Sequence, residues 1–352
     1  METKHFKTTN YIAPKTKNSL KDLFWTLIFP IIGLAFLFAG IGVTKEPVFT
    51  NQIVLKNMLL SMITVLIACF ALNTNLNSGR MDFSLGSVGI LATVIAWKVL
   101  PNHEADNFAI IFLITTIVIG IVLGLISGAI FVFLKIPAIV VSLGVCLIYE
   151  GITYAICNGK GSVELHAIEA PSLYPFISSP AFMIICVLVV SVFMLLTLKY
   201  SKFGHDKLSL LYGQKVSVDT GINEIKNALV CYALAGALIA LYTYISSINL
   251  SKVTISTNLG SAMSVMANFL PIFLGGLIAK HSNEVIGLAL GVVSVTFFKE
   301  GLIRLGVSDS NISLITSFLI FIILTYMVNW VNWMNAIKNK IKNYKLSKYE
   351  GK

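Results

Sequence analysis

The stretch at residues 78–86, Ser-Gly-Arg-Met-Asp-Phe-Ser-Leu-Gly, places polar side chains directly before an apolar run. Asp82 and Ser84 each carry a side-chain oxygen that could accept the first backbone N–H groups of a helix. Gly86 would permit the close approach of another backbone. One interpretation is a helix cap that positions the next helix. The other is a broken helix whose N-terminus points into the path of a solute.

Two carboxylates lie inside apolar runs, where an ionised side chain is costly and often functional. Glu150 could bind a coupling ion or line a solute path. Glu300 and Arg304 are four residues apart, so on a helix they could instead form a structural ion pair. The residues that we expect to contribute to the translocation path or to structural turns are Asp82, Ser84, Gly86, Glu150 and Glu300.

The sequence lacks the phosphate-binding, metal-binding and nucleophile motifs that commonly mark a catalytic site. It has no G-x-x-x-x-G-K-[ST] phosphate loop, and residues 159–162, Gly-Lys-Gly-Ser, lack the leading glycine and the strand–turn–helix setting of one. The five cysteines form no C-x-x-C pair, which argues against a metal site or a disulfide framework. We therefore predict no catalytic residues, no metal and no cofactor in this chain. A partner subunit would hydrolyse any ATP that drives it.

The composition indicates that lipid surrounds the helices that carry Asp82, Glu150 and the other candidate residues. Of the 352 residues, 56% are hydrophobic and only 12% are charged, against about 25% charged in soluble domains. A membrane-spanning helix needs about 20 mostly apolar residues. Ten such runs lie near 23–43, 53–72, 84–100, 108–134, 138–157, 180–198, 227–248, 262–280, 284–304 and 312–332. The sequence predicts an all-α, polytopic membrane helix bundle of about ten transmembrane helices.

The basic residues predict the orientation of this bundle. The formal net charge is +10, and lysines gather in the N-terminal arm, in the gap at 199–226 and in the C-terminal tail. Loops rich in Lys and Arg stay in the cytoplasm, and ten crossings place both termini on that side. This pattern fits anionic lipid as a partner and argues against nucleic acid. We expect a cytoplasmic arm at 1–22, a permease domain at 23–332 and a basic cytoplasmic tail at 333–352.

Two further features concern how the helices meet each other and a partner. Small residues at four-residue spacing let helix backbones approach closely in lipid. The glycines expected at such contacts are Gly120, Gly124, Gly128, Gly287 and Gly291. Matching strings around these two sets suggest an inverted repeat, although such strings are frequent in any membrane helix. The polar gap at 199–226 is long enough to hold a short helix that docks a partner, and the alternative is a solvated linker.

Taken in order, these strings resemble the ribose-type (monosaccharide) permease family of ATP-binding-cassette importers. That family typically shows Gly-Ile-Asp-Leu-Ser-Val-Gly-Ser, and residues 80–87 read Arg-Met-Asp-Phe-Ser-Leu-Gly-Ser. The family's cytoplasmic loop has Phe-Gly and then Ser-Gly-Ile-Asn. The corresponding residues of this chain are Phe203, Gly204, Thr220, Gly221, Ile222 and Asn223. The order and spacing of the strings hold from about residue 55 to 330.

The resemblance implies a permease subunit in a bacterial cell membrane that carries a small polar solute, usually a sugar or a nucleoside-like compound, by alternating access. It also implies a cytoplasmic ATPase, a second permease subunit and an extracytoplasmic solute-binding protein as partners. The residues 199–226, with Phe203, Gly204, Gly221, Ile222 and Asn223, would then contact the ATPase. The alternatives are an ion-coupled secondary transporter, with Glu150 as the ion-binding carboxylate, a lipid-modifying membrane enzyme, and a structural membrane protein.

Several positions depart from the family's pattern. Glu150 follows Tyr149 where the family often has arginine, and Lys299 and Glu300 stand where it tends to show paired asparagines. Neutral hydrogen-bonding positions have thus become charged. The hypothesis that follows is a cargo other than ribose, or a chain that works beside a second, different permease.

Overall fold

The computed structural model describes residues 19–45, 48–49, 51–101, 107–165, 179–327 and 329. Within these residues, 9 helices are long and apolar enough to cross a membrane, and the shorter α3 accompanies them. Together they correspond to the ten runs expected from the sequence, so the prediction of a polytopic helix bundle is confirmed. The helices are α1 (Ser19–Thr44), α2 (Gln52–Leu76), α3 (Leu85–Val99), α4 (Phe108–Leu134), α5 (Ala138–Ile156), α7 (Pro180–Leu195) with the π-helical turn Leu196–Tyr200, α8 (Lys202–Asp219), α9 (Glu224–Leu250), α10 (Gly260–Met266), α11 (Phe269–Ala279), α12 (Glu284–Arg304) and a last helix, Asp309–Met327.

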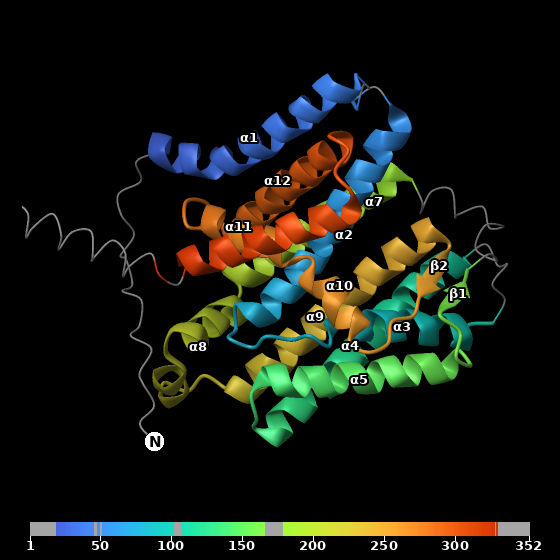
Figure 1. The fold of residues 1–352 in the computed structure, drawn as a ribbon. Coiled ribbons are helices and arrows are strands. Elements are labelled where there is room, and N and C mark those ends of the chain that lie inside the picture. Colours follow the sequence, from blue (N-terminus) through green and yellow to red (C-terminus); the bar gives the residue numbers. More distant parts are fainter. Residues whose placement is uncertain are drawn as a thin grey trace, which may run out of the picture.

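Two details differ from an uninterrupted bundle. The eighth run is divided into α10 and α11 at Ala267 and Asn268. Two short strands, β1 (Ser162–Glu164) and β2 (Lys252–Thr254), pair antiparallel with Val163 opposite Val253. The expectation of an all-α chain missed this pair, because three residues are too few to show a strand periodicity. Figure 1 shows the strands at one end of the bundle and α8 at the other.

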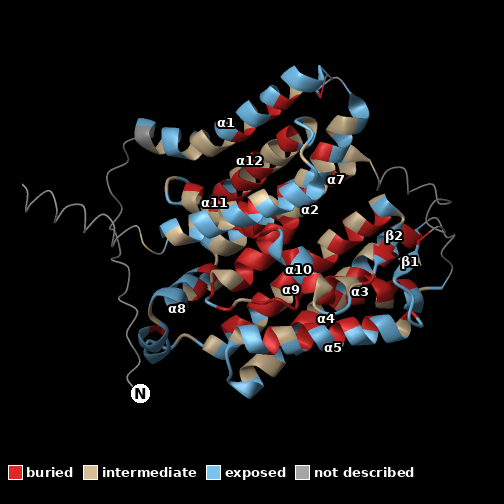
Figure 2. Ribbon diagram, in the orientation of Figure 1, coloured by how far each residue is buried: buried red, intermediate tan, exposed pale blue. Residues whose placement is uncertain are grey.

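Helix α9 is the most buried of the described spanning helices and packs against α4 through glycines. A Cβ atom on Gly120 would overlap the side chain of Ala240, and one on Gly124 would overlap the carbonyl oxygen of Tyr232. A Cβ atom on Gly236 of α9 would overlap the carbonyl oxygen of Gly120. In lipid such close backbone contact supplies dispersion energy that bulky side chains would prevent. Figure 2 shows buried residues concentrated along α9 and its neighbours.

The other glycines expected at helix contacts lie at similar crossings. Gly128 faces the ring of Tyr232 on α9. On α12, Gly287 and Gly291 face the backbone of α11 around Gly275. Both glycine sets therefore lie in helix interfaces, which leaves little of their surface for the lining of a path.

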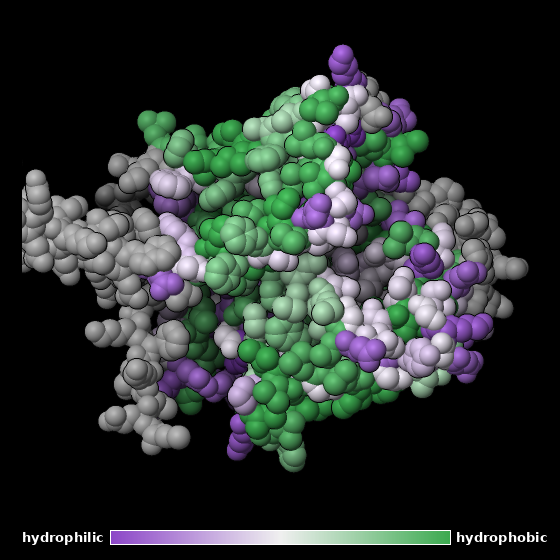
Figure 3. All heavy atoms as spheres, viewed as in Figure 1, coloured by the Kyte–Doolittle hydropathy of each residue, from purple (hydrophilic) through white to green (hydrophobic). Residues whose placement is uncertain are grey.

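The outside of the bundle is apolar. Large hydrophobic side chains are exposed on most of the spanning helices, and only 6% of the most apolar window of the last helix is buried. Figure 3 shows a broad hydrophobic surface, with hydrophilic residues gathered toward its ends. Lipid can solvate such a surface and water cannot. The chain is therefore a multi-pass membrane protein. The expected cytoplasmic arm and tail lie almost wholly outside the described residues, so the orientation of the termini remains a prediction.

Candidate functional site: a crossing of two helix starts

The turn between α2 and α3 is buried and is held together by Asp82. Its Oδ1 accepts hydrogen bonds from the backbone N–H of Ser84 at 2.9 Å and from the Ser84 hydroxyl at 2.6 Å. Its Oδ2 accepts a bond of 2.9 Å from the Asn75 side chain at the end of α2. Asp82 is only 4% exposed. These bonds fix the backbone immediately before α3.

Glu150 holds the start of α10 in the same manner from a neighbouring helix. Its Oε2 accepts the backbone N–H of Leu259 at 2.9 Å, and its Oε1 accepts the backbone N–H of Ser261 at 2.8 Å. The Ser261 hydroxyl also donates to Oε1. Helix starts leave N–H groups without partners and carry a partial positive charge. The buried carboxylate, 3% exposed, thus satisfies both requirements of α10.

The two helix starts meet each other. A Cβ atom on Gly86, in the first turn of α3, would overlap the carbonyl oxygen of Ser261 in the first turn of α10. Cys146 of α5 completes the contact, with its Sγ 3.2 Å from the Ser261 hydroxyl oxygen. Because α3 follows the α2–α3 turn and α10 follows β2, the starts approach from opposite ends of the bundle (Figure 1). Asp82, Ser84 and Gly86 from one string therefore meet Glu150 from a distant part of the sequence at one crossing.

An unpartnered apolar face lies beside this crossing. On α5, Cβ atoms on Gly144 and Gly151 would meet nothing within 4 Å, and the neighbouring Ile148 is 57% exposed. On α10, Met263 is 71% exposed, although it lies two residues after the buried Ser261. We call this exposed side of the two helices the α5–α10 face; Figure 1 shows α5 and α10 next to each other. It combines open space on α5 with flexible thioether side chains on α10.

Glu300 is not part of the crossing. Its Oε1 accepts a hydrogen bond of 3.1 Å from Nε of Arg304, one turn further along α12. This is the ion pair that the four-residue spacing allowed. The adjacent Gly301 packs against the backbone of α1 at Phe36. Glu300 therefore lies beside the α1–α12 interface, and this geometry does not support the expected role in the translocation path.

Two carboxylates connect α8, which lies in the gap at 199–226, to the rest of the bundle. One of them is Glu284, at the start of α12. Its Oε1 accepts hydrogen bonds from the side chains of Asn73 and Asn77 at the end of α2. Lys207 of α8 is buried, and its Nζ lies 3.7 Å from the same oxygen. One carboxylate thus joins α8, α2 and α12.

A second carboxylate, Glu224, makes an equivalent connection at the first residue of α9. Its Oε1 accepts a hydrogen bond of 2.6 Å from Gln214 of α8. The same oxygen lies 3.9 Å from Nη2 of Arg80, which is 5% exposed in the α2–α3 turn. Arg80 is two residues from Asp82. The second connection therefore leads from α8 directly to the turn that fixes α3.

The five residues expected in a coupling loop lie at the two ends of α8. Phe203 and Gly204 are in its first turn, and Gly204 packs against the carbonyl oxygen of Leu198. Gly221 has a φ of 93°, which suits glycine at a helix end. Asn223 caps α9 by accepting the backbone N–H of Lys226 at 2.9 Å. These residues set where α8 begins and ends.

The two carboxylates that anchor α8 were not found from the sequence. Glu224 and Glu284 look like ordinary acidic residues in the first turn of a helix, where they would only complement the helix dipole. Lys207 looks like one more lysine in a basic loop. The one available signal was Arg80, which lies in the same string as Asp82 and just before an apolar run.

Comparison with known proteins gives a family. Residues 54–328 match the family described as the permease component of branched-chain amino acid transport systems. The chain is 24% identical over 280 residues to an autoinducer 2 import system permease protein of Photorhabdus laumondii, covering 78% of this chain and 81% of the relative. It is 23% identical over 309 residues to a galactose/methyl galactoside import permease protein of Salmonella typhimurium, covering 83% and 91%. No solved structure matches.

Proposed function

The chain belongs to this family of transport permease components. From that premise, we propose that it conducts a small, neutral, sugar-like solute past the crossing of α3 and α10. It is a membrane-spanning permease subunit of an ATP-binding-cassette importer, and a separate subunit hydrolyses the ATP. The resemblance to monosaccharide permeases noted from the sequence is confirmed at the level of the family. The relatives import autoinducer 2 and galactose or methyl galactoside, as their names state.

The observation that carries the proposal is that a buried carboxylate already lies at each of the two helix starts in the crossing. A free helix N-terminus attracts anions, and broken helices in transporters often bind the carboxylate of a substrate in this way. Here Glu150 accepts the backbone N–H groups of Leu259 and Ser261 at the start of α10, and Asp82 accepts the N–H of Ser84 directly before α3. Each start therefore already faces a carboxylate, and the hydroxyls and thioether groups next to it are uncharged. These groups suit a polar solute without net charge.

The exposed α5–α10 face is a suitable surface for contact with a second permease subunit. A face with exposed Met263 beside the open glycines of α5 lacks its own cover of side chains. We propose that the solute path runs between this face and the corresponding face of the second subunit. Such an arrangement around a twofold axis brings equivalent residues close together.

Cross-linking tests this arrangement. In the assembled transporter, the Gly151→Cys variant is expected to be linked to the neighbouring permease subunit by a short bifunctional maleimide. The mass of the product would show whether the neighbour is the same chain or a different one. Val118→Cys, on the exposed side of α4, is the control and should give no product. A product from Val118→Cys in place of Gly151→Cys would contradict the proposal.

The end of the bundle that carries α8 is the proposed docking site of the ATPase. Helix α8 is largely exposed on its outer side, and it is tied inward by Lys207 and Gln214. A movement of α8 would be transmitted through Glu224 and Glu284 to the first residues of α9 and α12. Through the contact between Glu224 and Arg80 it would also affect the turn before α3. We propose that the opposite end, which carries β1 and β2, faces the extracytoplasmic solute-binding protein.

An ion-coupled transporter is the second candidate function, and Glu150 was its best sequence feature. An ion-binding carboxylate needs an oxygen that can take up a proton or a cation. Both oxygens of Glu150 accept hydrogen bonds from the start of α10. The geometry therefore favours a structural role for this carboxylate and weighs against ion coupling through it.

The substrate class is tested by uptake. Cells that produce the chain with its partner subunits should take up at least one neutral sugar-like solute from a panel containing galactose, methyl galactoside, ribose and autoinducer 2. Cells lacking only this chain should not. Uptake confined to charged amino acids would contradict the proposal of a neutral solute.

A further inference from the structure

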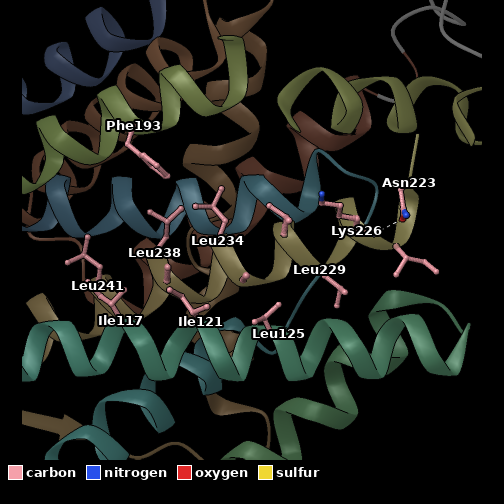
Figure 4. Close-up of a pocket in the computed structure, with 14 residues that line it drawn as sticks. Ile117, Ile121, Leu125, Phe193, Asn223, Lys226, Leu229, Leu234, Leu238 and Leu241 are labelled. Carbon is pink, nitrogen blue, oxygen red and sulfur yellow. Dashed lines mark hydrogen bonds between the residues drawn. The ribbon is translucent and has the colours of Figure 1, made fainter. Parts of the chain in front are cut away.

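An apolar groove runs along the outside of the bundle between α4, α7 and α9, and its lining includes none of the residues of the crossing of α3 and α10. It has a volume of about 580 Å³. Ala233 and Ala237 of α9 form part of its lining, where their small side chains leave a hollow beside Ile117 and Ile121 of α4. Phe193 of α7 lies on the other side. Figure 4 shows Ile117 and Ile121 on one side of α9 and Phe193 on the other.

The groove is polar at one end only. Lys226 and Asn223, in and just before the first turn of α9, are the two polar residues of its lining. The Asn223 side chain is used to cap α9, so the Lys226 ammonium group is the charge available there. Lys226 is exposed, and within the described part of the chain no carboxylate pairs with it.

The shape of the groove favours a flexible hydrocarbon chain over another helix. Where two helices of this protein pack closely, glycines face backbone, as Gly33 and Gly40 of α1 do against α12. In the groove, branched and aromatic side chains such as Ile117, Ile121 and Phe193 line the sides. These would hold a helix backbone away, whereas an acyl chain can follow an irregular apolar surface.

The length and the charge of the groove fit a phospholipid. From Lys226 to Leu241 the helical rise gives about 22 Å, and one leaflet of the hydrocarbon core is about 15 Å thick. An acyl chain can therefore lie wholly against α9 while its phosphate reaches the lysine. A lysine near a bilayer surface typically extends its ammonium group to the headgroup level, where it attracts anionic lipid.

We propose that this groove is a binding site for one anionic phospholipid, with an acyl chain along α9 between Ile121 and Phe193 and the phosphate on Lys226. The α8 end of the bundle carries the headgroup, which places it next to Glu224 and the second anchor of α8. The site does not depend on which solute the transporter carries.

Lipid retention measures this site directly. The purified full chain would be exchanged into detergent with either phosphatidylglycerol or phosphatidylcholine and analysed by native mass spectrometry. We expect one retained phosphatidylglycerol per chain. Lys226→Gln should reduce its retention about fivefold, as expected for one lysine at the headgroup level. Ala237→Trp, which fills the groove, should reduce retention of both lipids.

Matched variants keep the test decisive. Lys135→Gln removes an exposed lysine at the end of α4, and Val118→Trp introduces the same tryptophan side chain on α4 outside the groove lining. Both should retain phosphatidylglycerol as the unmodified chain does. Equal retention by the Ala237→Trp chain, or no preference between the two lipids, would overturn the proposal. Efficient cross-linking of two chains through Ala233→Cys would also overturn it, because a second protein subunit would then occupy the groove.

Discussion

Replacing Glu150 by leucine is expected to destabilise the protein strongly and to abolish uptake. The change leaves the backbone N–H groups of Leu259 and Ser261 buried without an acceptor. Each unsatisfied buried donor costs about 1–3 kcal/mol. We therefore expect a loss of about 3 kcal/mol in the free energy of unfolding, seen as a large fall in the melting temperature of the purified chain in detergent.

Two variants show which property of Glu150 matters. Glu150→Gln retains one acceptor oxygen, so it should be clearly more stable than Glu150→Leu. Asp309→Asn neutralises an exposed carboxylate and should leave the melting temperature nearly unchanged. If Glu150→Leu melted like the unmodified chain and still failed to transport, the carboxylate would act on the solute or on an ion. The assignment to the start of α10 would then be wrong.

Replacing Lys207 by methionine is expected to uncouple ATP hydrolysis from uptake. Methionine fills a similar volume, so the fold should survive, but the link from α8 to Glu284 is lost. Free energies of coupling between sites typically correspond to changes of 5–150-fold, and we expect uptake to fall about tenfold. The measurement compares uptake with ATP hydrolysis stimulated by the loaded binding protein, using the intact transporter.

A merely structural role for Lys207 predicts a different outcome. If the ion pair transmits movement, Lys207→Arg should restore uptake while Lys207→Met keeps its ATPase subunit bound. Lys135→Met, which alters an exposed lysine outside α8, is the control and should transport normally. Normal uptake by Lys207→Met, or loss of the ATPase subunit from that variant, would refute the coupling role.

The sequence was sufficient for the spans and for parts of the crossing. Ten apolar runs predicted the helices because lipid demands long apolar segments wherever a chain crosses it. The Asp82 string identified the turn before α3 because the polar residues stand directly before an apolar run. Glu150 was singled out by its cost inside such a run. The partner of Glu150 could not be foreseen, since the start of α10 lies more than a hundred residues further along the chain.

The anchors of α8 show why the rest was out of reach. A lysine in a cytoplasmic loop is normally exposed, and nothing in its neighbours marks Lys207 as buried beside Glu284. Single polar contacts between distant elements leave no periodicity that could be recognised. The same holds for β1 and β2, two strands of three residues in which Val163 pairs with the distant Val253. The groove on α9 likewise arises from two alanines that look like ordinary helix residues.

The central claim is that this chain is the permease of an importer powered by ATP, and one reconstitution tests it most directly. The chain, its ATPase subunits and its binding protein would be placed together in liposomes with galactose as the first solute. We predict uptake that requires ATP and persists when an ionophore abolishes the proton and sodium gradients. Uptake that continues without ATP and disappears with the ionophore would contradict the account.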